Sequence, residues 1–267
     1  PNLQPNFFVP RMYHGIICSF EQTGQTREAI SYRAELVPRL WRLTLNHQSR
    51  IFQDKSVPDI IREVLLDGGL QSDDFRFSLQ GTYEPLNKPP REFCVQYRES
   101  DFNFISRLME EEGIFYFFEY NDDKEIMVIA DSPSVHKEAI PRSDALYEAP
   151  TGLPPLEVET VFPLQYKKSV LPSKVTLKDF NYDTPQMNLL ASSQINPVTP
   201  MEVSDYPGRF GFMSRGNHLA RVRDEEIIAG QKIISGKSGC RSFCAGYRFT
   251  LKGHPRADFN RKYLLIR

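Results

Sequence analysis

The chain has 267 residues, with 33 Lys and Arg against 34 Asp and Glu, so its formal net charge is −1. The lack of a basic excess argues against a dedicated nucleic-acid-binding protein. Hydrophobic residues make up 40% and charged residues 25%, which is typical of a soluble globular protein with one large or two ordinary domains. The sequence holds no apolar run of about 18 residues, so it predicts no transmembrane helix and no stable membrane insertion.

The 19 Phe, 12 Tyr and 20 Pro favour a β-rich chain. The first residue is Pro1 and not Met, so we expect a fragment of a longer protein. No signal peptide is visible, and in a fragment this says little about localisation.

Residues 12–45 are predicted to form strands. A period of two, as in a half-buried strand, is set by Ile30, Tyr32, Ala34 and Leu36. Thr23 and Gly24 occupy the expected position of the hairpin turn. A third strand of the same type, with Trp41 in the core, is predicted from Trp41, Leu43 and Leu45.

The pattern changes to that of a helix at Ser56, which can cap the first turn. Pro58 is tolerated in that turn, and Asp59 complements the positive end of the helix dipole. One apolar stripe follows, formed by Val57, Ile60, Ile61, Val64 and Leu65. Gly68 and Gly69 are expected to end the helix. Residues 70–91 are polar, include "YEPLNKPP" and are predicted to be a loop.

The stretch "CVQYRESDFNFISRLMEEEGIFYFF" predicts a strand, a helix and a second strand. The first strand is indicated by the alternation of Phe93, Val95 and Tyr97. Ser100 can cap the helix, and its buried stripe is expected to be Phe102, Ile105, Leu108 and Met109. Gly113 ends the helix, and strands are predicted from Ile114 to Tyr120 and, after the "NDDK" turn, from Glu125 to Ala130.

Four carboxylates in this stretch, Asp101, Glu110, Glu111 and Glu112, raise the question of catalysis. Successive helical residues point roughly 100° apart, so the three glutamates fan around the helix. A catalytic carboxyl pair must flank a single bond at about 5 to 10 Å. We therefore expect a solvated helix surface and no site.

The second half of the chain carries weaker patterns. Residues 131–170 are predicted to be a long connection with short strands, 173–182 a strand and 183–212 an extended loop. Residues 214–229 are expected to be helical, with Leu219, Val222 and Ile227 facing inward. Strands then follow, with a turn at "GHPRAD", and they are indicated by Tyr247, Phe249 and Leu251 and by the final "KYLLIR".

Sequence motifs for chemistry are absent. There is no Walker loop, no strand followed by G-x-G-x-x-G, no H-E-x-x-H and no G-x-S-x-G, so we predict no catalytic residue and no cofactor. The five histidines are expected at strand edges or turns: His14, His47, His136, His218 and His254.

The four cysteines, Cys18, Cys94, Cys240 and Cys244, are expected to be reduced core thiols. Cys240 and Cys244 could in principle bind a metal ion. No CxxC pair accompanies them, so no metal site is predicted. "DYPGRF" and "GHPRADFN" are typical turns, and their Arg209 and Arg256 could pair with acids across a subunit interface.

Six blocks in order resemble the N-terminal part of the VgrG family, the spike proteins of type VI secretion systems: "YHGIICSFEQ", "YRAELVPRLWRLTLNHQSRIFQDKSVPDIIREVL", "CVQYRESDFNFISRLMEEEGIFYFF", "VTLKDFNYDTP", "EVSDYPGRF" and "GHPRADFN…YLL". The resemblance implies a mainly β fold of the phage baseplate hub type. Its two related antiparallel β-barrel domains would carry an inserted α/β domain and form a homotrimer.

On this resemblance, residues 1–47 are expected to form a first β-barrel that is incomplete at its N-terminus. Residues 48–160 would form the inserted α/β domain. Residues 161–267 would form the second barrel, with a helical insertion near 214–229. No needle repeat is present, so we expect the hub without a puncturing tip or an effector extension.

The resemblance implies a structural adaptor between a six-fold tail tube of Hcp-like hexamers and a puncturing needle, which aids effector delivery. Its partners would be the tube protein, the needle and tip proteins and the effectors, but no nucleic acid. The protein would be cytoplasmic during assembly and then secreted. Two alternatives stay open: a cell-wall glycoside hydrolase, and a carbohydrate-binding β-protein that uses the aromatics of "IFYFFEY". The oligomeric mass in solution would separate them from a trimeric hub.

Overall fold

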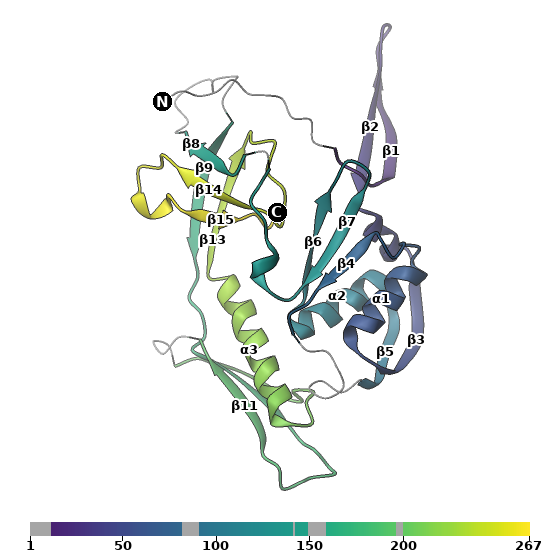
Figure 1. The fold of residues 1–267 in the computed structure, drawn as a ribbon, viewed down its shortest axis with the longest axis vertical. Coiled ribbons are helices and arrows are strands. Elements are labelled where there is room, and N and C mark those ends of the chain that lie inside the picture. The colour runs from purple at the N-terminus through teal and green to yellow at the C-terminus, as the bar shows by residue number, and fades with distance from the viewer. Residues whose placement is uncertain (1–11, 82–90, 141, 149–158, 196–199) are drawn as a thin grey trace.

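The computed structural model describes residues 12–81, 91–140, 142–148, 159–195 and 200–267. Figure 1 shows a hairpin that projects at one corner, an α/β body around two helices, and a second region that extends along a long third helix. The strand content makes the fold mainly β. Among the helices of the described chain, none combines the length and apolar character needed to cross a bilayer.

The α/β body is formed by a continuous part of the chain. Its helical segments are η1 (Arg39–Thr44), α1 (Val57–Asp67) and α2 (Asp101–Glu112). Its strands are β3 (His47–Lys55), β4 (Phe75–Ser78), β5 (Arg91–Ser100), β6 (Phe115–Tyr120) and β7 (Glu125–Ala130). Among the described strands β3 pairs only with β5, and β4, β7 and β6 form a second sheet. The two helices lie side by side and bury one apolar core (Figure 1).

The helix ends confirm the local predictions. Ser56 Oγ accepts a hydrogen bond from the Asp59 amide at 3.3 Å, and Ser100 Oγ accepts one from the Asn103 amide at 3.1 Å. Gly113 ends α2 with φ 72°, a conformation that favours glycine. The whole predicted stripe of α1 is buried. In α2, Phe104 is buried where Phe102 was expected, and Phe102 is half-buried.

The second region contains two sheets. β10 (Lys174–Asp179) lies between β11 (Leu189–Gln194) and β12 (Glu202–Asp205), and α3 (Met213–Ala229) packs on β10 and β11. The larger sheet has the order β13-β9-β8-β14-β15. Its strands are β8 (Asp144–Tyr147), β9 (Thr160–Lys168), β13 (Lys232–Ser238), β14 (Arg248–Lys252) and β15 (Lys262–Leu264). The expected helix at 214–229 and the burial of Leu219, Val222, Phe249 and Leu251 are confirmed.

Two loop predictions need correction. β4 lies inside the predicted loop 70–91, and β11 and β12 lie inside 183–212. These strands have only four to six residues. Their alternation of apolar and polar residues is too short to predict a strand against the loop signal of the surrounding Pro and Gly. "YEPLNKPP" lies outside the described residues. β13 was not predicted, although Ile233 and Ile234 lie in it.

The predicted third strand at 41–45 is wrong. Residues 41–44 belong to η1 and Leu45 caps its C-terminal end; the two buried side chains of η1, Leu40 and Leu43, lie three positions apart. That spacing fits one turn of a 3₁₀ helix and not the alternation of a strand. Trp41 is half-buried and Leu45 is exposed, so Trp41 is not a core residue of this chain.

β1 (Ile16–Gln25) and β2 (Ile30–Val37) form the projecting hairpin (Figure 1). Its turn spans Thr26 to Ala29, where Thr26 Oγ1 accepts a hydrogen bond from the Ala29 amide at 3.0 Å. The predicted turn at Thr23 and Gly24 is therefore wrong, because Gly24 pairs with Ser31 within the ladder. The predicted half-burial is also wrong for the single chain, since both faces of the hairpin are exposed.

Gly246→Ala should destabilise the fold by about 2 kcal/mol or more. Gly246 has φ 88°, and an added Cβ would lie 2.4 Å from the Phe117 ring. Chemical denaturation should show the loss. Gly239→Ala is the control, because a Cβ there meets nothing within 4 Å. Equal unfolding midpoints for the two variants would contradict this close approach of the backbone to Phe117.

Candidate functional site

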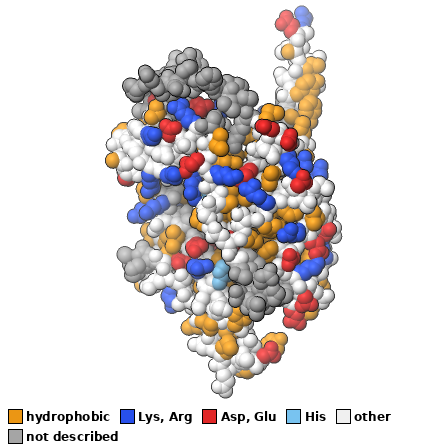
Figure 2. Space-filling model, viewed as in Figure 1, with side chains coloured by type: hydrophobic (Ala, Val, Ile, Leu, Met, Phe, Trp, Pro, Cys, Tyr) orange, Lys and Arg blue, Asp and Glu red, His pale blue; other side chains and the backbone are white. Residues whose placement is uncertain are grey.

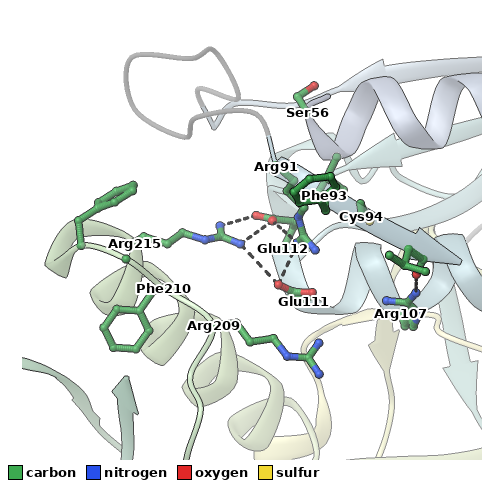
Figure 3. A pocket seen from close by; sticks show the side chains of 14 residues that line it. Ser56, Arg91, Phe93, Cys94, Arg107, Glu111, Glu112, Arg209, Phe210 and Arg215 are labelled. Atoms are coloured by element: carbon green, nitrogen blue, oxygen red, sulfur yellow. Dashed lines mark hydrogen bonds and ion pairs between the residues drawn. The ribbon is translucent and has the colours of Figure 1, made fainter. Parts of the chain in front are cut away.

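The acidic end of α2 is a buried ionic junction with α3 (Figure 3). The Glu112 side chain is 4% exposed, and its two oxygens accept hydrogen bonds from Arg215 Nη1 at 2.6 Å and Nη2 at 2.5 Å. Arg91 of β5 donates a further bond to Glu112 at 3.1 Å. Residues 103 positions apart in the chain are thus joined by a charge-assisted, bidentate contact.

The predicted solvated surface is correct for only one of the four carboxylates. Glu110 is 61% exposed and lies 3.8 Å from Arg223. Glu111 is mostly covered and pairs with Arg91 at 2.9 Å. Glu112 is buried as described, and α3 is what covers it. Although they point in different directions from the helix, Glu111 and Glu112 both reach Arg91, because long side chains can bend toward a shared partner.

Asp101 is the other exception, because it is fully buried. It receives hydrogen bonds from Asn46 Nδ2 at 2.6 Å and Gln96 Nε2 at 2.8 Å, and it pairs with Arg50 at 3.1 Å. These partners come from β3, from β5 and from the residue before β3. Asp101 therefore fastens the start of α2 to the β3–β5 ladder.

Burial alone would lower the pKa of Arg91, but the charges of Glu111 and Glu112 outweigh it and raise that pKa. Arg91 is therefore a fixed cation. Each carboxylate in the junction already has a guanidinium partner. The cluster joins two parts of the molecule and does not offer a free pair of carboxyl groups to a substrate.

A groove lies beside this junction, between β5 and the segment that leads into α3 (Figure 3). Its larger cavity has a volume of about 460 Å³ and is lined by β5, the C-terminal end of α2 and residues 209–215. A second cavity of about 330 Å³ adjoins it. Both cavities are lined by Arg107, Glu111 and Arg209, so they form one groove.

Arg209 and Arg256, the two predicted interface residues, differ in environment. Arg256 pairs with Asp258 at 2.8 Å and lies over the Phe259 ring, 4.2 Å from its centroid. Arg209 is exposed, with φ 57°, and no carboxylate of the described chain lies within ion-pair distance of it. A single chain does not test the interface role, which stays a prediction for both.

The aromatic strand proposed for carbohydrate binding is β6, and its rings are largely occupied. Phe117 is buried, and Tyr116 and Phe118 pack against the core of the α/β body. Phe115 stacks on His136, with ring centroids 5.1 Å apart. β6 thus presents no open aromatic platform to a sugar.

The remaining candidate ligands stand apart. None of the four cysteines forms a disulfide; Cys94 is buried and the others are partly buried. Burial raises the pKa of the Cys94 and Cys240 thiols. Within the described ranges no three His, Cys, Asp or Glu side chains are arranged to hold a metal ion. His218 lies on α3, so the strand-edge or turn prediction is wrong for it.

Two apolar surfaces of the described chain are uncovered. One face of the hairpin carries five exposed apolar side chains: Ile17, Phe20, Ile30, Tyr32 and Leu36. Phe20 and Tyr32 stack across the strands at 5.3 Å, and Figure 2 shows apolar side chains along the hairpin. The outer face of the β3–β5 ladder is likewise apolar and carries Ile51, Phe93, Val95 and Tyr97. The strand predicted from Phe93, Val95 and Tyr97 is therefore confirmed, with these side chains facing outward.

Comparison with known proteins decides the family. Residues 3–267 match the family described as phage tail baseplate hub (GPD). The chain belongs to this family. The members of this family are described as components of the phage tail baseplate. The chain shares a mainly β fold with a solved structure of this kind.

The relatives of this hub chain include type VI spike proteins. It is 35% identical to VgrG1a and 34% identical to VgrG1c of Pseudomonas aeruginosa, in each case over 96% of the chain. It covers 39% and 35% of their respective lengths. It is also 30% identical over 99% of its length to the actin cross-linking toxin VgrG1 of Vibrio cholerae, of which it covers 24%. The resemblance to the VgrG family is confirmed.

Two solved structures share the fold of this hub chain. One is the E. coli c3393 protein, described as a type VI secretion component with similarity to the T4 bacteriophage tail proteins gp27 and gp5. It has a TM-score of 0.67 and 24% identity, over 95% of this chain and 55% of that one. The other is a tail protein from Neisseria meningitidis, with a TM-score of 0.63 and 10% identity over 94% of this chain and 73% of that one.

Proposed function

We propose that the chain is the hub of a type VI secretion spike. It forms a homotrimer that adapts a six-fold, Hcp-like tail tube to a puncturing needle, and it contributes to the delivery of effectors. Its other partners are needle and tip proteins. It binds no nucleic acid. It assembles in the cytoplasm and is then secreted. The similarity to VgrG spike proteins over nearly the whole chain supports this function.

The proposed hub has two barrels, from residues 1–47 and 161–267, around an inserted domain at 48–160. β1 and β2 contribute to the first barrel, and the five-stranded sheet contributes to the second. β8 lies before residue 161 but pairs with β9 and β14, so it extends the second barrel. Arg209 and Arg256 are retained as candidates for the subunit interface.

The uncovered hairpin is the observation that supports assembly most directly. A two-stranded hairpin is marginally stable in water unless its apolar face is covered. In the described chain β1 and β2 pair only with each other, and five apolar side chains of their shared face are exposed. The same face would be buried if each hairpin packed against a neighbouring copy in a closed ring.

The proposed function includes no enzymatic activity. The two glutamates nearest the groove are paired with Arg91 and Arg215, and no catalytic motif is present in the sequence. The similarity to an actin cross-linking toxin covers 24% of that protein, so it supports the shared hub and not the toxin's chemistry. Neither the sequence motifs nor the described residues of the groove favour a hydrolase.

Light scattering on the purified chain should give the mass of a trimer. Replacing Phe20 and Tyr32 together with Ser should shift that mass to the monomer and leave the circular dichroism spectrum largely unchanged, because both side chains are exposed in the single chain. Glu21→Ala with Arg33→Ala, a cross-strand pair at 3.0 Å, is the matched control and should stay trimeric. A monomeric wild-type chain would count against the trimer, as would a monomeric protein that also carries the needle.

A further inference from the structure

The groove beside β5 has features of a peptide-binding site. We propose that it binds an extended, acidic segment of a partner protein, with one carboxylate of that segment paired to Arg209. The cavity volumes of about 460 and 330 Å³ lie in the usual range for binding pockets. This inference does not depend on the trimeric hub function, and it competes with the subunit-interface role predicted for Arg209.

The groove holds one guanidinium that has no carboxylate partner within the described ranges. Its two cavities are lined by five arginines and four carboxylates: Arg91, Arg107, Arg209, Arg215 and Arg223, with Glu110, Glu111, Glu112 and Asp205. Four of these arginines have a carboxylate within 4.0 Å. Arg209 is the exception within the described ranges. A carboxylate is the chemical complement of this uncompensated guanidinium.

Arg209 is held in place by its neighbours in the chain. The Phe210 amide donates to Asp179 Oδ2 at 3.0 Å, and the Gly208 amide donates to the Lys178 carbonyl at 2.8 Å. The Phe210 ring is buried against Gly216 of α3. Arg209 is therefore displayed between two anchored residues and extends toward the groove (Figure 3). Such preorganisation lowers the entropic cost of binding.

The opposite wall offers a strand edge that is open at Phe93 among the described strands, while Arg107 occupies the Val95 carbonyl. β5 pairs with β3 on one side only, and among the described strands its other edge is unpaired. The Val95 carbonyl accepts a hydrogen bond from Arg107 Nη2 at 2.6 Å, so the backbone groups of Val95 point away from β3. Phe93 lies two residues away and shares this orientation. An extended peptide can pair with the Phe93 backbone and the Val95 amide, and it can place alternate side chains on Phe93 and Val95, which are exposed.

Fluorescence anisotropy can test this with two fluorescein-labelled, C-terminally amidated peptides, Thr-Val-Glu-Val-Thr and Thr-Val-Gln-Val-Thr. The purified chain should bind the Glu peptide about tenfold more tightly than the Gln peptide. Arg209→Gln should remove this preference and leave the affinity for the Gln peptide unchanged. Arg221→Gln is the matched control, because Arg221 is exposed, lines neither cavity and already pairs with Glu225.

The source of the carboxylate is tested by the Gln peptide with a free C-terminus. Tenfold tighter binding than its amide would support a terminal carboxylate as the ligand, provided that Arg209→Gln abolishes the gain. Absent binding, equal affinities for the Glu and Gln amides together with no gain from the free terminus, or an Arg209→Gln variant that binds like wild type would overturn the proposal. So would glutarate binding as tightly as the Glu peptide, since that indicates a small-anion site. A fall in solution mass for Arg209→Gln would assign Arg209 to the subunit interface and overturn it too.

Discussion

Glu112→Gln should lower the free energy of unfolding by about 3 kcal/mol, because it removes the charge between two largely covered guanidinium groups. The Glu112 side chain is 4% exposed, and Arg215 and Arg91 both donate to it. The neutral amide can accept a hydrogen bond but cannot balance the charge of Arg215. Urea denaturation monitored by circular dichroism would measure the loss.

Glu110→Gln is the matched control on the same helix. Its side chain is 61% exposed and lies 3.8 Å from Arg223, so the change should cost no more than about 0.5 kcal/mol. The three glutamates cannot therefore be replaced together without loss of stability, contrary to what a solvated cluster would allow. Similar unfolding midpoints for the two variants would show that α3 does not pack on Glu112 in solution.

Ile61→Asp should have the largest effect of any single substitution discussed, and should leave much of the protein unfolded. Ile61 is fully buried in the core of the α/β body. The change removes apolar packing and places an unpaired carboxylate where no partner awaits it, which together cost at least about 4 kcal/mol. That is a large part of the 5 to 15 kcal/mol by which an ordinary domain is stable.

Leu66→Asp makes a comparable change in the same helix at an exposed position. It places a negative charge near the helix C-terminus, which costs about 1 kcal/mol or less. Soluble yield and thermal melting of the two variants should therefore differ widely. Wild-type melting of Ile61→Asp would mean that the α1 stripe faces water.

The elements that the sequence predicted well are those that depend on near neighbours. The caps at Ser56 and Ser100, the glycine stop at Gly113 and the stripe of α1 all depend on contacts within a few residues. The strand from Glu125 to Ala130 was predicted with its correct ends for the same reason. Its turn residues and its apolar run are adjacent in the chain.

The predictions that failed depended on partners far away in the chain. The sequence predicts a solvated Glu112 because the residue that covers it, Arg215, lies 103 positions later in the chain. No pattern near Glu112 indicates that contact. The hairpin looked half-buried because an amphipathic pattern shows which face is apolar but not what lies against it. The groove was not anticipated, since its walls come from β5, α2 and the segment before α3. The spacing of its arginines carries no local signature. Among the residues of the groove, the sequence predicts a contact with another subunit for Arg209 alone.

The α/β body is formed by one continuous part of the chain, and this affects the order in which the parts of the protein fold during synthesis. All the residues of its buried core lie between Leu40 and Ile129. Domains generally fold as units, N-terminal ones first, while synthesis proceeds. The body can therefore fold on the ribosome before Arg215 is translated, and until α3 emerges Arg91 but not Arg215 can pair with Glu112. The Glu112–Arg215 ion pair then forms late, when the newly synthesised α3 region packs against an α/β body that has already folded.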